Sequence, residues 1–272
     1  MSYLKLPEII LHLGVVMASQ TDTQTGAVTP TQQHRLRRTN ISLGFLHLAQ
    51  GIVIFILGSG FSALVTTSYI GSSVEYRYEP RIMLAVFLFI SAFCHLLVSL
   101  PKVFPWYIRN LGKHINYVRW YEYSISASVM IVVIASLCGI TELVSLLGLF
   151  FLTAGMNLFG LMMELQNQST TRTNWTAFIF GSILGAVPWA AILLYFVKST
   201  PAPPMFVYAV VASLMFFYAL FPLNMWLQYA RKWCWRDYIW GEYGYMFLSL
   251  TAKSLLAWQV FAGTLNAASW LK

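Results

Sequence analysis

Long apolar stretches dominate the pattern of hydrophobic and polar positions along the chain. An α-helix that crosses a bilayer needs about 20 mostly apolar residues, because the hydrocarbon core is about 30 Å thick and a helix rises about 1.5 Å per residue. Seven stretches meet this length, and they cover about residues 42–65, 81–100, 115–139, 143–163, 175–197, 205–228 and 238–267. The pattern therefore predicts an all-α membrane protein with seven transmembrane helices.

The start of the chain is predicted to lie mostly outside this bundle. Residues 1–40 are expected to form a cytoplasmic extension, and residues 41–272 to form the seven-helix domain. The apolar patch Ile9–Met17 favours a segment in the membrane interface, with a cleaved signal peptide as the alternative. The Thr- and Gln-rich stretch Thr21–Gln33 is typical of a flexible segment.

The first connection between spans, Thr66 to Pro80, is the only long loop on its side of the membrane. Val74, Tyr76 and Tyr78 alternate with charged residues in it, and Gly71-Ser72-Ser73 supplies a turn before them. This alternation predicts a small β-hairpin. Because an exposed strand edge can pair with another chain, a homodimer contact is expected here.

The composition agrees with an integral membrane protein. Hydrophobic residues make up 58% of the chain and charged residues 10%, which is far from the balance of a soluble domain. The net charge of +8 comes from basic residues scattered through short loops, so it indicates topology and not a nucleic-acid-binding face. The histidines and the three cysteines have no metal-ligand spacing, so no metal site is expected.

The distribution of Lys and Arg predicts the orientation in the membrane. If the N-terminus is inside, the inner segments carry eleven of the 17 basic residues and the outer segments carry four. The remaining two, Arg119 and Lys253, lie within predicted helices. Basic residues concentrate in cytoplasmic loops, so the chain is expected to have a cytoplasmic N-terminus and an extracellular C-terminus.

Lys253 lies close to the middle of the last apolar stretch. A charged lysine at this depth costs roughly 2.5–3.5 kcal/mol on insertion scales, so an intramembrane lysine indicates a functional site. Condensation of its amine with an aldehyde, which gives a Schiff base, would explain the position. The alternative is a lysine paired with a carboxylate purely for helix packing. Ser249 lies four residues earlier and therefore on the same helix face.

Glu122 is the expected partner of Lys253, because it is the one acidic residue well inside a predicted span. Glu164 and Glu242 are expected at helix ends instead. A nearby anion favours the charged form of a Schiff base. His47 and His95 fall at a similar depth on two antiparallel spans, so together with Arg119 and Ser249 these side chains predict a polar cavity.

Aromatic residues of the third and sixth spans are candidates for the walls of a chromophore pocket. Pro222 should kink the sixth helix and open space beside it. The candidates, which would otherwise be ordinary core residues, are Trp120, Tyr123, Phe217, Tyr218, Phe221 and Trp226.

Two runs of sequence carry a family resemblance. The run RWYEYSISAS over residues 119–128 and the run AKSLLAW over residues 252–258, together with Ser249, closely resemble the heliorhodopsin family, and the resemblance covers about residues 40–270. It implies a retinal-binding rhodopsin bundle with its N-terminus inside and a homodimer contact at a β-structure in the first outer loop. It implies that Lys253 holds retinal and that Glu122 is the counterion. Ser249 would lie beside the Schiff base, and His47 and His95 would be cavity histidines.

The expected function is a light-absorbing photoreceptor, not an enzyme, that carries all-trans retinal on Lys253. The resemblance implies a slow photocycle, no ion pumping and a sensory or signalling role. The residues agree, because a proton pump needs titratable relays towards both faces. In the outer half, the stretches Ser126–Cys138 and Ser254–Thr264 hold no ionisable side chain apart from the thiol of Cys138.

Two alternatives stay open at this point. A light-gated passive proton channel could use Glu242 and the histidines on the inner side, and Gln259 with serines 124, 126 and 128 on the outer side. A light-regulated interaction protein would act through its basic inner loops on an unidentified cytoplasmic signalling partner.

Overall fold

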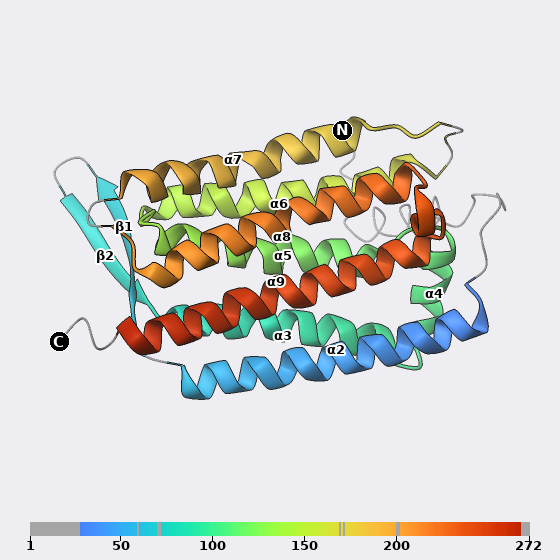
Figure 1. Ribbon diagram of the computed structural model, residues 1–272, viewed down its shortest axis with the longest axis horizontal. Helices are drawn as coiled ribbons and strands as arrows, with labels where there is room; N and C mark the ends of the chain where they lie inside the picture. Colours follow the sequence, from blue (N-terminus) through green and yellow to red (C-terminus); the bar gives the residue numbers. More distant parts are fainter. Residues whose placement is uncertain are drawn as a thin grey trace, which may run out of the picture.

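The computed structural model describes residues 28–58, 60–69, 72–168, 170, 172–199 and 202–267, and the expected interfacial segment Ile9–Met17 lies outside these ranges. Long helices lie side by side in one bundle (Figure 1). They are α2 (Pro30–Leu57), α3 (Pro80–Ser99), α5 (Tyr117–Leu137), α6 (Leu143–Gln166), α7 (Thr176–Lys198), α8 (Met205–Tyr229) and α9 (Tyr238–Ala267).

The prediction of a seven-helix membrane bundle is confirmed. Six of the described helices, α2, α3 and α5 to α8, are long and apolar enough to cross a membrane. The seventh, α9, has 30 residues and runs the length of the bundle in Figure 1. Its polar residues, which include Glu242, Lys253 and Gln259, lower its mean hydropathy. Glu242 and Lys253 are buried and belong to the polar interior of the bundle.

The first span begins earlier than the hydropathy pattern predicts. α2 starts at Pro30, not near residue 42, because Thr29 and Gln32 form a capping box and Pro30 occupies the first turn. The basic residues of this segment therefore belong to the helix. Arg37 donates from Nε to the carbonyl of Ser99 at 3.1 Å. The helix ends at Leu57, so the predicted end of this span near residue 65 is wrong.

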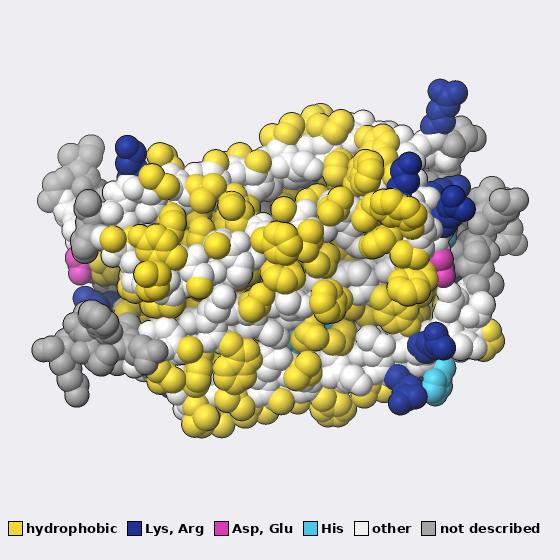
Figure 2. All heavy atoms as spheres, viewed as in Figure 1, with side chains coloured by type: hydrophobic (Ala, Val, Ile, Leu, Met, Phe, Trp, Pro, Cys, Tyr) yellow, Lys and Arg dark blue, Asp and Glu magenta, His cyan; other side chains and the backbone are white. Residues whose placement is uncertain are grey.

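A short helix that hydropathy did not predict lies at one end of the bundle. This helix, α4 (Phe104–Gly112), is amphipathic: Tyr107 and Leu111 are buried, while Trp106 and Arg109 face outward. It lies across the ends of the longer helices in Figure 1. We call this end of the bundle the α4 end. Exposed Lys and Arg side chains gather there in Figure 2, whereas hydrophobic side chains cover the flank of the bundle.

The predicted β-hairpin is confirmed and lies at the opposite end, which we call the hairpin end. Strands β1 (Ala63–Tyr69) and β2 (Ser72–Tyr78) pair antiparallel, with Ala63 opposite Tyr78. The free edge of β1 is covered, because Thr66 donates its N–H to the carbonyl of Thr141 at 2.8 Å. The outer face of β2 is exposed, with Tyr76 56% accessible.

The interior of the bundle differs between its two ends. The largest cluster of buried apolar side chains fills the hairpin half and includes Ile54, Phe87, Ile131, Ile134, Leu214 and Leu256. A smaller apolar cluster around Leu36, Tyr107 and Leu111 packs under α4. Between the two clusters lie the buried polar residues from which the site is built.

Candidate functional site

An apolar cavity of about 330 Å³ lies between α5, α6, α7, α8 and α9. Five of the residues predicted as pocket walls line it, namely Trp120, Tyr123, Tyr218, Phe221 and Pro222. Phe217 is not among the lining residues and packs against the apolar cluster of the hairpin half. Trp226 is 42% exposed on the outside of α8 and takes no part in the cavity.

Lys253 and Ser249 of α9 both line this cavity. Lys253 supplies the only amine among the described lining residues. Lys253 Nζ donates to Glu122 Oε1 at 2.7 Å and to Ser249 Oγ at 2.9 Å. Ser91 on α3 donates from Oγ to the same Glu122 oxygen at 2.7 Å. Lys253 is 3% exposed and Glu122 7%, so the structure brings together the pair that the sequence predicts.

The two histidines lie close together beside this pair. Their rings stack with centroids 5.8 Å apart. His95 Nδ1 is 2.7 Å from Asn40 Oδ1, a partner that the sequence did not indicate. Both ring nitrogens of His47 are buried and have no hydrogen-bond partner among the described residues. Two imidazoles therefore lie near the ion pair, and some of their ring nitrogens make no hydrogen bond to the described protein groups. Such nitrogens can bind a proton.

A second, smaller cavity of about 40 Å³ extends from Glu122 towards the α4 end. Its polar walls come from five elements and are Asn40, His95, Tyr107, Asn116, Arg119, Glu122 and Glu242. The cavity is polar and large enough for water, which needs about 10–15 Å³ of such volume per molecule. It joins the surroundings of Glu122 to a second group of charges.

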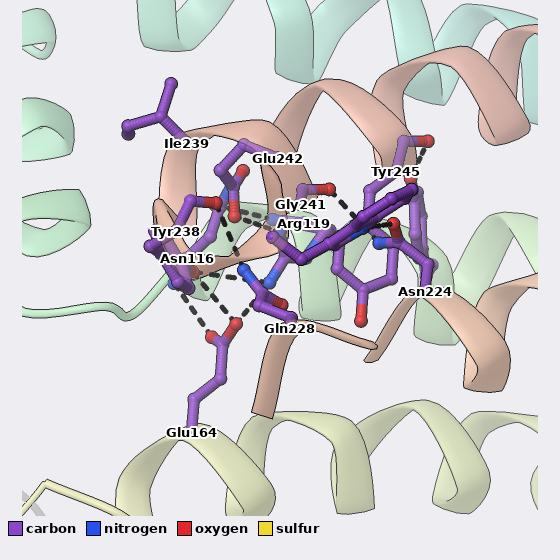
Figure 3. Close-up of polar contacts among 12 residues, drawn as sticks. Asn116, Arg119, Glu164, Asn224, Gln228, Tyr238, Ile239, Gly241, Glu242 and Tyr245 are labelled. Atoms are coloured by element: carbon purple, nitrogen blue, oxygen red, sulfur yellow. Dashed lines mark hydrogen bonds and ion pairs between the residues drawn. The ribbon is translucent and has the colours of Figure 1, made fainter. Parts of the chain in front are cut away.

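That second group is centred on Arg119, which forms ion pairs with both Glu164 and Glu242 (Figure 3). In Figure 3, Glu164 points from α6 and Glu242 from α9 towards the guanidinium. Asn116 donates from its backbone N–H to Glu164 at 2.9 Å and from Nδ2 to Glu242 at 2.8 Å. Tyr238 OH donates to Glu164 at 2.9 Å. We call Arg119, Glu164 and Glu242 the arginine cluster.

Sequence reasoning missed this cluster because both glutamates fall near helix ends. Glu164 lies close to the end of α6, and Glu242 in the second turn of α9. Even so, these side chains are 0% and 1% exposed. One signal was available: a buried arginine needs a carboxylate partner, and Glu122 was already assigned to Lys253.

Glycines on α6 and α7 shape the apolar cavity. A Cβ at Gly160 would lie 2.2 Å from Cζ3 of Trp120, and one at Gly185 would lie 2.3 Å from Sδ of Met156. Both contacts are far shorter than van der Waals distance, so each glycine lets a bulky wall residue approach the helix closely. A cavity with apolar walls and one buried amine is suited to an apolar ligand that carries a carbonyl group.

Comparison with known proteins identifies a family. A protein-family model described as Heliorhodopsin matches residues 36–265, which include both cavities and all seven long helices apart from their first or last residues. No curated protein matches the chain.

The contact between Gly160 and Trp120 yields a prediction with an internal control. Gly160→Ala should force the Trp120 ring to move and destabilise the protein by about 1–3 kcal/mol, as overpacking does. Gly148→Ala on the same helix meets nothing within 4 Å, so it should be neutral or slightly stabilising through helix propensity. Thermal unfolding in detergent compares the two variants. Equal midpoints would contradict the role assigned to Gly160.

Proposed function

Since this chain belongs to the heliorhodopsin family, it is a retinal-binding membrane rhodopsin, and we propose that its output is sensory or signalling and not ion pumping. The observation that carries the site assignment is the position of Lys253, whose amine reaches an apolar cavity while bonded to a buried carboxylate. We propose Lys253 as the point of retinal attachment and Glu122 as its counterion.

The residues around the larger cavity fit an apolar polyene aldehyde. Its walls are mostly aromatic and aliphatic, and Gly160, Gly181 and Gly185 let the wall residues Trp120, Phe159 and Met156 pack closely against α6 and α7. When bound to Lys253 as a protonated Schiff base, all-trans retinal would absorb visible light and change shape by isomerisation. Trp120, Tyr123 and Phe221 would hold it in place, and Pro222 interrupts the hydrogen bonding of α8 beside it.

The polar residues near Nζ would control the proton that this nitrogen carries. Glu122 stabilises the positive charge, and Ser249 and Ser91 hold the two charged groups in place. If the geometry between Nζ and Glu122 is disturbed, the proton becomes easier to lose. His47 and His95 would be the acceptor group, because they stand beside the pair towards the α4 end.

The apolar interior of the hairpin half supports a non-pumping role. Side chains such as Met130, Ile131 and Ile134 fill the space between the ion pair and the hairpin end. A transported proton would need titratable groups or water there. The same apolar packing argues against the alternative of a light-gated proton channel, although the smaller cavity between Glu122 and Glu242 would supply the other half of such a path.

The partners of the protein follow from its two ends. The exposed outer face of β2 supports a homodimer formed through the hairpin. The basic α4 end supports a cytoplasmic location for that end. We expect an unidentified signalling partner to bind there. A slow photocycle would give this partner time to respond. The N-terminus would then be cytoplasmic and the C-terminus extracellular.

The attachment site is tested by Lys253→Ala, expressed with retinal. No visible absorption band should form, whereas Lys102→Ala, which removes an exposed lysine, should leave the band unchanged. Loss of Lys253 leaves Glu122 buried without a partner, which costs about 3–5 kcal/mol. The double variant Lys253→Ala with Glu122→Gln removes this charge and separates misfolding from loss of attachment. A red-shifted pigment in either variant would falsify the assignment.

The counterion is tested by Glu122→Gln in a pH titration of the visible band. Without the carboxylate, the positive charge on Nζ is less stable, so the conversion to an ultraviolet-absorbing form should occur at lower pH than in the wild type. Glu75→Gln removes an exposed carboxylate of β2 and should leave the titration midpoint unchanged. An unchanged midpoint for Glu122→Gln would mean that another group supplies the negative charge.

The orientation can be tested by glycosylation in a eukaryotic host. Asn167 and Asn174 begin glycosylation sequons between α6 and α7, at the end proposed to be cytoplasmic, and should stay unmodified. Ile70→Asn creates a sequon with Gly71 and Ser72 in the hairpin connection, and this site should be modified. A third natural sequon begins at Asn40, which is buried within α2 and gives no information. The converse pattern of modification would reverse the proposed orientation.

A further inference from the structure

The arginine cluster contains more acid than base. Arg119 contacts both Glu164 and Glu242, and among the described residues it is the only cation within ion-pair distance of either carboxylate. The other buried ion pair is balanced, because Glu122 meets Lys253 one to one. If both glutamates of the cluster were ionised, a site that is almost fully shielded from water would carry one excess negative charge.

The hydrogen bonds of the cluster do not compensate for this excess. Arg119 directs Nη1 to Glu242 and Nη2 to Glu164, so it makes a bidentate pair with neither. The remaining donors are neutral groups of Asn116 and Tyr238. A buried charge without an opposite charge is strongly unfavourable, and a carboxylate in this position becomes neutral by binding a proton.

The other titratable groups that face the cluster do not supply positive charge. Six are phenols, which are uncharged at pH 7; they are Tyr107 of α4, Tyr117 and Tyr123 of α5, Tyr229 of α8, and Tyr238 and Tyr245 of α9. The ring of His114 stacks on Tyr238 with centroids 4.9 Å apart. Burial and the charge of Arg231 lower the pKa of His114 against the opposing effect of Asp237, so this ring is neutral at pH 7.

The remaining titratable side chains that line the smaller cavity are Cys94, which is uncharged as a thiol, His95 and Glu122. His95 of α3 bonds to Asn40 and stacks on His47, and it contacts neither carboxylate of the cluster. Glu122 is paired with Lys253. The excess acid is therefore not balanced from the cavity side.

We propose that Glu164 and Glu242 together bind one proton at neutral pH, so that the arginine cluster is neutral. The proton adds to a lone pair of one carboxylate oxygen, and Arg119 stays a cation paired with the other carboxylate. Glu242 lines the same cavity as Glu122, so loss of this proton would add a negative charge facing the counterion. The cluster is thus a second proton-binding site, separate from the amine of Lys253 and independent of any bound retinal.

Infrared spectroscopy of the full-length protein without retinal tests the site. The wild type should show the C=O stretch of a protonated carboxyl group, which shifts in D₂O. Either Glu164→Gln or Glu242→Gln alone should remove this band, because each leaves one carboxylate paired with Arg119. Glu75→Gln is the matched control: it removes an exposed carboxylate of β2 outside the cluster, so the band should keep its intensity.

Arg119→Gln gives a test in the opposite direction. With the cation removed, both carboxylates should be protonated and the band should about double, provided that circular dichroism shows a native helix content. If Arg119→Gln does not fold, the two single glutamate variants still decide the matter. The proposal is wrong if the wild type lacks the band, or if the band survives both Glu164→Gln and Glu242→Gln. Because no retinal is present, these outcomes leave the proposed photoreceptor function unaffected.

Discussion

The ion pair between Lys253 and Glu122 is the interaction on which the rest of the structure depends. It joins α9 to α5 at 2.7 Å in the middle of a bundle whose flank is apolar. Removing either partner leaves a buried charge, which costs about 3–5 kcal/mol, whereas the intact pair is close to neutral in free energy. The pair therefore adds little to the stability of the fold. A chemical use of the amine explains its presence better than helix packing does, because apolar residues would pack as well.

The need to compensate buried charge also divides the bundle into two unlike halves. Towards the hairpin end, the interior is apolar and packed. Towards the α4 end, it holds the histidines, the smaller cavity and the arginine cluster. A change in charge or position at the Lys253–Glu122 pair can therefore affect other polar groups only towards the α4 end. This asymmetry agrees with the sensory role proposed above, and it differs from the continuous path that a pump requires.

Sequence patterns predicted the features that depend on local sequence. They failed for features that depend on contacts between distant parts of the chain. The seven spans, the hairpin and the pairing of Lys253 with Glu122 follow from length, alternation and charge. The early start of α2 could have been found from the capping box at Thr29 and Gln32. The need of Arg119 for a carboxylate partner was visible in the sequence, but the identity of Glu164 and Glu242 as partners was not, because it results from helix ends that converge on Arg119 under α4. Phe217 does not line the cavity, because neighbouring aromatic residues on one helix face different directions, and spacing alone did not show which of them meets the cavity.

Helix geometry explains how the Lys253–Glu122 pair and the arginine cluster can lie close together inside one bundle. On α5, Arg119 and Glu122 are three residues apart, which is about 4.5 Å along the axis, whereas Glu242 and Lys253 on α9 are about 16 Å apart. Side chains on a helix lean towards its N-terminus, and both helices begin at the α4 end. Lys253 therefore reaches back along α9 to Ser249 and Glu122, and Arg119 reaches back along α5 to Glu164 and Glu242. Only long cationic side chains cover these distances. The space that remains between the two sites is the smaller cavity. The positions of Arg119 and Glu122 on α5, and of Glu242 and Lys253 on α9, are thus the physical reason why Glu122 faces the arginine cluster.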